Sequence, residues 1–139
     1  MYTLKTSASF DSAHFLKGYE GKCSNIHGHR WTVELEVASE NLETEGQCRG
    51  MIVDFSTLKN DLGDLVDYLD HALIIEKGSL KEKTMEVLKE EGFRIIEVDF
   101  RPTAENFAQY FYREMADKGY KVAKSTVYET PNNGASYSE

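Results

Sequence analysis

The chain has 139 residues, a length that suits one domain with a hydrophobic core of its own. Its 24 acidic side chains outnumber the 16 basic ones, which gives a formal net charge of −8. No basic segment of the kind that nucleic-acid-binding proteins carry is visible, so we expect no nucleic-acid partner. An acidic protein can still bind an anionic small molecule through local cations or a metal ion.

The N-terminal residues and the short apolar runs predict a cytoplasmic protein. Residues 1–6 lack the apolar stretch of a signal peptide. Runs such as residues 72–75 are far too short to span a bilayer, so we expect no membrane association. The cysteines, Cys23 and Cys48, are too few for the disulfide framework of a secreted protein, although a single bridge stays open as an alternative.

Hydrophobic periodicity predicts the secondary structure. The expected strands cover residues 2–16, 27–39, 93–100, 120–130 and 135–138. The expected helices cover residues 54–69, capped by Asp54, 79–91, which ends before a Gly92 cap, and 103–118. Loops are expected at residues 17–22 and 41–50, and a turn at 131–134. This order predicts an α+β fold, an antiparallel sheet with helices on one face, within one domain over residues 1–139.

Three histidines are expected on one face of two neighbouring strands. Alternate residues of a strand project from the same face, so His27 and His29 point the same way. His14 has the parity of the apolar residues in its own strand, and strands adjacent in sequence usually pair. Three imidazoles with an open fourth position are the ligand set of a catalytic zinc ion. The alternative is three ordinary histidines at a strand end, and copper or iron stays open as the metal.

Cys23 precedes the His-Gly-His sequence in a polar loop. As a fourth metal ligand, it would close the site and make it structural. As a thiolate with a pKa lowered by the cation, it would be a base or nucleophile. A buried thiol without a role is the third alternative, and spacing alone does not choose between ligand and base.

Three further residues, an adjacent pair and a single glutamate, carry side chains that can take part in chemistry. Asp70 and His71 are adjacent, and a carboxylate can fix the tautomer of an imidazole and raise its basicity. The alternative is a cationic histidine facing the C-terminal dipole of a helix. Glu129 ends a strand, where a carboxylate can accept two parallel N–H bonds from an amidine-like heterocycle, although a solvated glutamate is the simpler interpretation.

Ordered motifs along nearly the whole chain resemble the family of 6-pyruvoyl-tetrahydropterin and 6-carboxy-tetrahydropterin synthases. The motifs are Phe10-Asp11-Ser12-Ala13-His14, Cys23-x3-His27-Gly28-His29, Val53-Asp54-Phe55 with Leu58-Lys59, Leu69-Asp70-His71, Pro102-Thr103-Ala104-Glu105-Asn106 and Tyr128-Glu129-Thr130. The resemblance implies the tunnelling fold, a four-stranded antiparallel sheet with two long helices on one face. It also implies a homohexamer of two stacked trimers, each of which closes a barrel.

The resemblance further implies chemistry on dihydroneopterin triphosphate. A Zn²⁺ ion would grip the side-chain hydroxyls of the substrate and acidify the neighbouring C–H bonds. The implied roles are metal ligands for His14, His27 and His29, proton-transfer base for Cys23, proton relay from a neighbouring subunit for Asp70 and His71, and pterin anchor for Glu129.

The spacing after Cys23 favours one branch of the family. Three residues separate it from His27, which resembles the 6-carboxy-tetrahydropterin synthases of queuosine and deazapurine biosynthesis, whose reaction releases acetaldehyde and triphosphate. A pyruvoyl-type synthase is the alternative on the same scaffold. A non-catalytic pterin- or zinc-binding module, in which Cys23 closes the metal site, is the alternative from another class. Residues 76–101 form an insertion relative to compact members. The candidate triphosphate contacts are Lys17, Lys22 and Arg30.

Overall fold

The computed structural model describes residues 1–139, and its elements confirm the α+β class. The strands are β1 (Tyr2–His14), β2 (His27–Ser39), β3 (Ala72–Glu76), β4 (Ile95–Val98), β5 (Val122–Thr130) and β6 (Asn133–Tyr137). The helices are η1 (Lys22–Ser24), a short 3-10 helix, and the α-helices α1 (Phe55–Leu69), α2 (Glu82–Glu90) and α3 (Ala104–Asp117). No helix is long and apolar enough to cross a membrane.

All six strands form one sheet in the order β4-β3-β1-β2-β5-β6. The strands β1, β2, β5 and β6 are antiparallel neighbours, but β3 pairs with β1, and β4 with β3, in parallel. The expected four-stranded antiparallel sheet was therefore wrong in strand number and in direction. The missed strand, β3, is a continuous apolar run with Ile74 and Ile75 fully buried. Such a run lacks the alternation that marks half-exposed strands, because parallel strands are covered on both faces.

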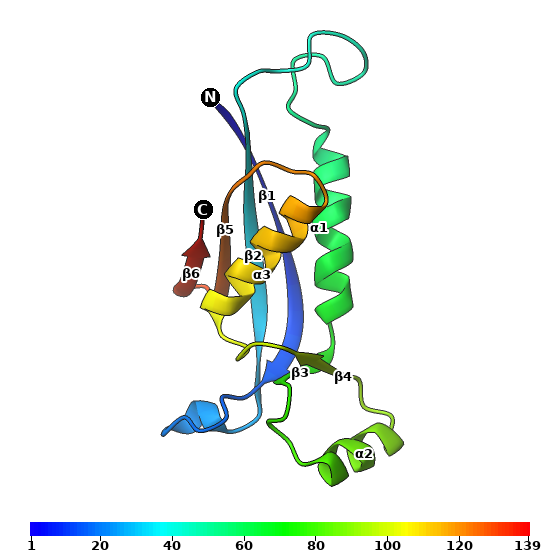
Figure 1. Cartoon of the computed structure of the whole chain (residues 1–139), viewed down its shortest axis with the longest axis vertical. Coiled ribbons are helices and arrows are strands. Elements are labelled where there is room, and N and C mark those ends of the chain that lie inside the picture. The colour runs from blue at the N-terminus through cyan, green and yellow to red at the C-terminus, as the bar shows by residue number, and fades with distance from the viewer.

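The long ladder between β1 and β2 determines which side chains share a face. Its register pairs Phe10 with Trp31 and His14 with His27. Phe10 and Trp31 belong to a single cluster of 20 buried residues, to which α1 and α3 also contribute. Figure 1 shows these two helices over the long strands. The helices therefore cover one face of the sheet, as expected, and hold β1 and β2 in a fixed register.

Side-chain caps fix where the two long helices begin. The carboxylate of Asp54 accepts a bond of 2.7 Å from the N–H of Ser56, which confirms the expected cap of α1. The hydroxyl of Thr103 accepts from the N–H of Asn106 at 3.3 Å and caps α3. Helix α3 thus starts at Ala104, two residues after Pro102, whose carbonyl contributes to the site described below.

The segment of residues 76–101, which was predicted to be an insertion, contains α2 and β4. The expected helix and strand are both present but shorter than predicted, with α2 starting at Glu82 and β4 limited to Ile95–Val98. Met85 of α2 packs with Phe15 and Ile75 in a separate small apolar cluster. Figure 1 shows α2 at the same end of the molecule as β3, β4 and η1. The insertion therefore lies near the end of the sheet that carries the histidines.

Candidate metal centre

The three predicted histidines meet at the end of the β1–β2 ladder. His14 ends β1, and His27 and His29 begin β2, with His14 directly opposite His27. Glu129 of β5 joins them, and the ligand atoms of the four residues all lie within 4.8 Å of one another. Strand pairing therefore brings together side chains that are more than 100 residues apart in the sequence.

The distances between the donor atoms fit a single tetrahedral ion. His14 Nε2 lies 3.1 Å from His27 Nε2 and 3.4 Å from Glu129 Oε1. Zinc–ligand bonds of the usual length place neighbouring donors about 3.3 Å apart at the corners of a tetrahedron. The cluster is therefore close to the size that one zinc ion requires.

Backbone carbonyls orient two of the rings. His14 Nδ1 donates to the Pro102 carbonyl at 2.7 Å, and His27 Nδ1 donates to the Asn25 carbonyl at 2.7 Å. These bonds place the proton on Nδ1 and leave the Nε2 lone pair free toward the centre of the cluster. Histidines that bind metals are commonly fixed in this way by a partner on the other ring nitrogen.

Burial favours the neutral rings that metal binding needs. Burial lowers the pKa of His14, although the Pro102 carbonyl acts in the opposite direction. Burial also lowers the pKa of His29, against the opposing charge of Glu129. The ring of Trp31 packs nearly perpendicular to those of His14 and His29, with centroids 4.9 Å and 5.3 Å away. The buried Trp31 ring thus packs against two imidazoles whose lowered pKa values favour the neutral form that binds a cation.

Glu129 was predicted to bind substrate, and the structure places its carboxylate against the histidines. Its Oε1 lies 2.7 Å from His29 Nε2, but the contact is misaligned, and the buried nitrogen has no hydrogen-bond partner. An unpartnered buried nitrogen costs free energy that a bound cation would remove. Strand parity carried the signal for this position, since Glu129 lies two residues after the buried Val127 and so faces the same side.

A small cavity of about 190 Å³ adjoins the cluster. His14 and Glu129 form one side of it, and Thr103, Glu105 and Asn133 contribute to the rest. These last three residues had no predicted role, although Thr103 and Glu105 belong to the Pro102-Thr103-Ala104-Glu105-Asn106 motif. The cavity places polar groups and the start of α3 beside the candidate metal ligands.

Cys23 stands apart from the four clustered residues. It lies in η1, the turn between β1 and β2, and its carbonyl accepts a bond of 2.9 Å from the N–H of Leu16. The thiol is free and half-buried. Glu129, and not Cys23, is the fourth side chain whose ligand atom lies with those of the histidines.

Asp70 and His71 form a close pair outside the cluster. His71 Nδ1 lies 2.8 Å from Asp70 Oδ2, and the imidazole side chain is 79% exposed. The other carboxylate oxygen of Asp70 accepts from the N–H of Asp11 at 2.8 Å, and this bond is the main reason that the pKa of Asp70 is lowered. His71 has a φ of 54°, which costs a non-glycine residue on the order of 1 kcal/mol.

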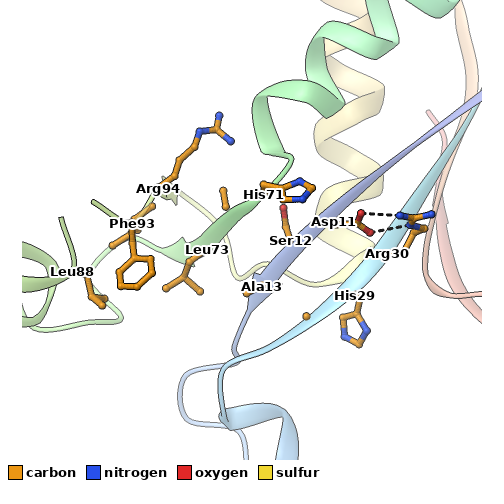
Figure 2. Close-up of a pocket in the computed structure, with 13 residues that line it drawn as sticks. Asp11, Ser12, Ala13, His29, Arg30, His71, Leu73, Leu88, Phe93 and Arg94 are labelled. Carbon is orange, nitrogen blue, oxygen red and sulfur yellow. Dashed lines mark hydrogen bonds and ion pairs between the residues drawn. The ribbon is translucent and has the colours of Figure 1, made fainter. Parts of the chain in front are cut away.

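His71 lines an open groove of about 690 Å³ together with Arg30 and Phe93. Figure 2 shows the ring of His71 well separated from that of His29. Arg30, a candidate triphosphate contact, makes a two-pronged ion pair with Asp11 at 2.9 Å for both bonds. Within one chain, the structure therefore unites the histidines with Glu129, and it leaves Cys23 and the Asp70–His71 pair outside that group.

The sequence is similar to those of known tetrahydropterin synthases. The sequence model of the 6-pyruvoyl tetrahydropterin synthase family matches residues 3–139. A 6-carboxy-5,6,7,8-tetrahydropterin synthase of Haemophilus influenzae is 31% identical, with both chains covered in full. Another from Rickettsia bellii is 33% identical over 88% of this chain and 90% of its own.

Solved structures support the same fold. An uncharacterized protein from Wolinella succinogenes superposes with a TM-score of 0.79 at 20% identity, covering 99% of this chain and 98% of its own. A 6-pyruvoyl tetrahydropterin synthase from Caenorhabditis elegans gives 0.68 at 24% identity, covering 99% and 95%. Because the family match spans nearly every residue, the chain belongs to the 6-pyruvoyl tetrahydropterin synthase family.

Proposed function

We propose that the protein is a zinc-dependent 6-carboxy-tetrahydropterin synthase, a lyase that converts dihydroneopterin triphosphate with release of acetaldehyde and triphosphate, in queuosine or deazapurine biosynthesis. The observation that carries this proposal is the convergence of the ligand atoms of His14, His27 and His29 within 4.8 Å of one another, with Nδ1 of His14 and of His27 bonded to a carbonyl and Nε2 left for the ion. The names of the full-length relatives support the 6-carboxy product over the pyruvoyl alternative.

The three histidines would hold the zinc ion, which supplies Lewis acidity toward the hydroxyls of the substrate side chain. Cys23, as a thiolate, takes the proton that this acidity releases from carbon. The Asp70 carboxylate keeps the proton of His71 on Nδ1, so that Nε2 of His71 is free to exchange a proton with substrate.

Glu129 and the small cavity beside it supply the pterin site in this proposal. The carboxylate faces both the histidines and the cavity, so it can turn toward a ligand that enters there. A carboxylate accepts two parallel N–H bonds from the guanidine-like edge of a pterin. Glu129 thereby orients the ring while the side chain of the substrate extends toward the metal.

The position of Cys23 bears on the non-catalytic alternative. A closed structural zinc site requires the thiolate as fourth ligand. Its place in η1, outside the group of converging ligand atoms, supports an open site instead. The Asp70–His71 pair lies outside the group of converging ligand atoms, and its imidazole is 79% exposed, which supports a homohexamer in which a neighbouring subunit supplies the relay.

Mass spectrometry of the products from dihydroneopterin triphosphate tests the assignment. The zinc-loaded protein is expected to form a carboxylated tetrahydropterin with acetaldehyde. A pyruvoyl product would move the protein to the other branch and leave the roles of zinc and Cys23 in place. No turnover by protein of verified zinc content would instead support the binding module.

A further inference from the structure

The turn that carries His71 is held by side chains that come from distant parts of the chain. Each carbonyl of residues 68–70 accepts a bond from one of them. Ser12 Oγ donates to the Leu69 carbonyl, Arg94 Nη2 donates to the Tyr68 carbonyl, and Arg94 Nη1 donates to the Asp70 carbonyl at 2.6 Å. These are carbonyls at the C-terminus of α1, where a helix has no partners of its own to offer. One guanidinium therefore bridges the two ends of this turn.

Arg94 is itself fixed at both its backbone and its side chain. Its carbonyl accepts a bond of 3.0 Å from the N–H of Leu73, and the next residue, Ile95, pairs with Leu73 in the parallel ladder. Its guanidinium lies over the ring of Tyr68, 5.6 Å from the centroid. Figure 2 shows the guanidinium extending away from Phe93, which lies toward Leu88. The parallel pairing of β3 and β4 thus places the arginine against the end of α1.

The geometry of the Asp70–His71 pair depends on this turn. The exposed imidazole has Asp70 as its side-chain partner, and the backbone N–H of His71 donates to the Asp11 carbonyl at 2.7 Å. The positive φ of His71 persists only where the surrounding structure imposes it. A loosened turn would let His71 relax toward the common backbone conformations and would carry its ring away from Asp70.

We propose that Arg94, which the inserted segment supplies, is a positioning residue for the Asp70–His71 pair. The inference rests on the proposed role of that pair in proton transfer. The two bonds from the guanidinium fix the carbonyls on either side of Leu69, and so hold His71 Nδ1 toward the Asp70 carboxylate. The insertion therefore serves the chemistry of the site as well as adding two elements to the fold.

Arg94→Gln tests the proposal in the zinc-loaded protein. We expect kcat to fall about 10- to 100-fold, because misplacing a proton-transfer group by about 1 Å has effects of that size. We expect KM to stay within about twofold and the zinc content to stay unchanged, because Arg94 contacts neither the histidines nor the small cavity. Arg94→Lys, which can reach one of the two carbonyls, is expected to recover part of the loss.

Two matched variants separate positioning from general stability. Arg113→Gln removes an exposed arginine of α3 whose one ion pair, with Glu139, is 4.0 Å long, and it should behave as the parent protein. Arg101→Gln removes the other arginine near the end of the insertion, which donates to the Lys17 carbonyl at 3.1 Å, and should leave the ring of His71 on Asp70. A crystal structure of each variant is the readout for that ring.

A double-mutant cycle identifies the residue through which Arg94 acts. Adding Arg94→Gln to His71→Ala should change the residual kcat by less than about twofold. The proposal is overturned if Arg94→Gln lowers kcat by the same factor in the parent protein and in His71→Ala. It is also overturned if Arg94→Gln keeps the kcat of the parent and its crystal structure still shows His71 against Asp70. If His71→Ala alone is fully active, the proton-relay role fails instead. The crystal structure of Arg94→Gln then decides the positioning claim, which is wrong if His71 has not moved.

Discussion

The histidine cluster and the Asp70–His71 turn achieve their geometry by opposite means. The cluster is built into a β-ladder, where His14 is 2% exposed and faces His27 through strand register. The turn lies at the end of a helix, where His71 is largely exposed and adopts a positive φ. The core supports the first region directly, whereas individual hydrogen bonds hold the second.

This difference implies different responses to substitution. In the cluster, backbone carbonyls orient the imidazoles of His14 and His27 separately, so removing one of these rings leaves the other in place. In the turn, the loss of one donor frees a strained backbone. Substitutions in the cluster should therefore change what is bound, and substitutions around the turn should change how well a bound substrate reacts.

The largest expected effect comes from removing a ligand. His27→Ala should lose zinc and, with it, activity by about 1,000-fold or more, because both the site and its Lewis acid disappear. Metal analysis by mass spectrometry and turnover measured on the same sample check this result. His71→Ala is the matched control and should keep zinc at the level of the parent protein.

Glu129→Gln tests whether this carboxylate, which also lies against the histidines, binds the substrate or the metal ion. In the proposed function it binds substrate, so the variant should keep its zinc while KM rises. Zinc loss equal to that of His27→Ala would make Glu129 a fourth ligand. Full activity of His27→Ala after verified metal loss would remove zinc from the mechanism.

The sequence predicted the cluster better than the turn for a physical reason. A strand has a period of two, so parity alone placed His14, His27 and His29 on one face once β1 and β2 paired. The same rule applied to Val127 would have placed Glu129 with them. Local pattern therefore predicts the three histidines, but the place of Glu129 also depends on the pairing of β5 with β2, two strands that are far apart in the sequence.

The surroundings of the turn depend on contacts that local pattern does not encode. The adjacency of Asp70 and His71 was visible, but Arg94 reaches them only because β3 and β4 pair in parallel. β3 escaped prediction because a short run of consecutive apolar residues shows no alternation of apolar and polar side chains. The contacts of Arg94 with the turn were therefore missed for the same reason as β3 itself.

A mixture of two defective variants tests whether the two regions meet across subunits. Cys23→Ala and His71→Ala should each lose most of the activity alone and retain zinc. If the relay comes from a neighbouring subunit, oligomers mixed at random should restore roughly a quarter of the sites. Recovery is measured as turnover after co-expression, with light scattering to confirm equal assembly. No recovery from mixed oligomers would mean that Cys23 and His71 act within one chain.

The smallest expected effect concerns the stability of the turn. The N–H of Asp11 and then His71 lower the pKa of Asp70 in the folded protein. The unfolded value is about 3.9, so this stabilisation is present above that pH and is lost as the pH falls through the folded pKa. The carboxyl side chain is 37% exposed and solvent screens it, so we expect about 1 kcal/mol or less at pH 7.

Asp70→Asn should remove this contribution and its pH dependence together. The difference in unfolding free energy between parent and variant should be constant from pH 7 to about 5 and should shrink toward pH 3. At low pH the carboxylate of Asp70 becomes protonated in the parent, which then loses the same charge that the substitution removed. Urea unfolding at each pH measures it. Asp64→Asn, at an exposed position of the same helix, should show no such trend. A difference that stays constant down to pH 3 would mean that backbone packing, and not the charge of Asp70, holds the turn.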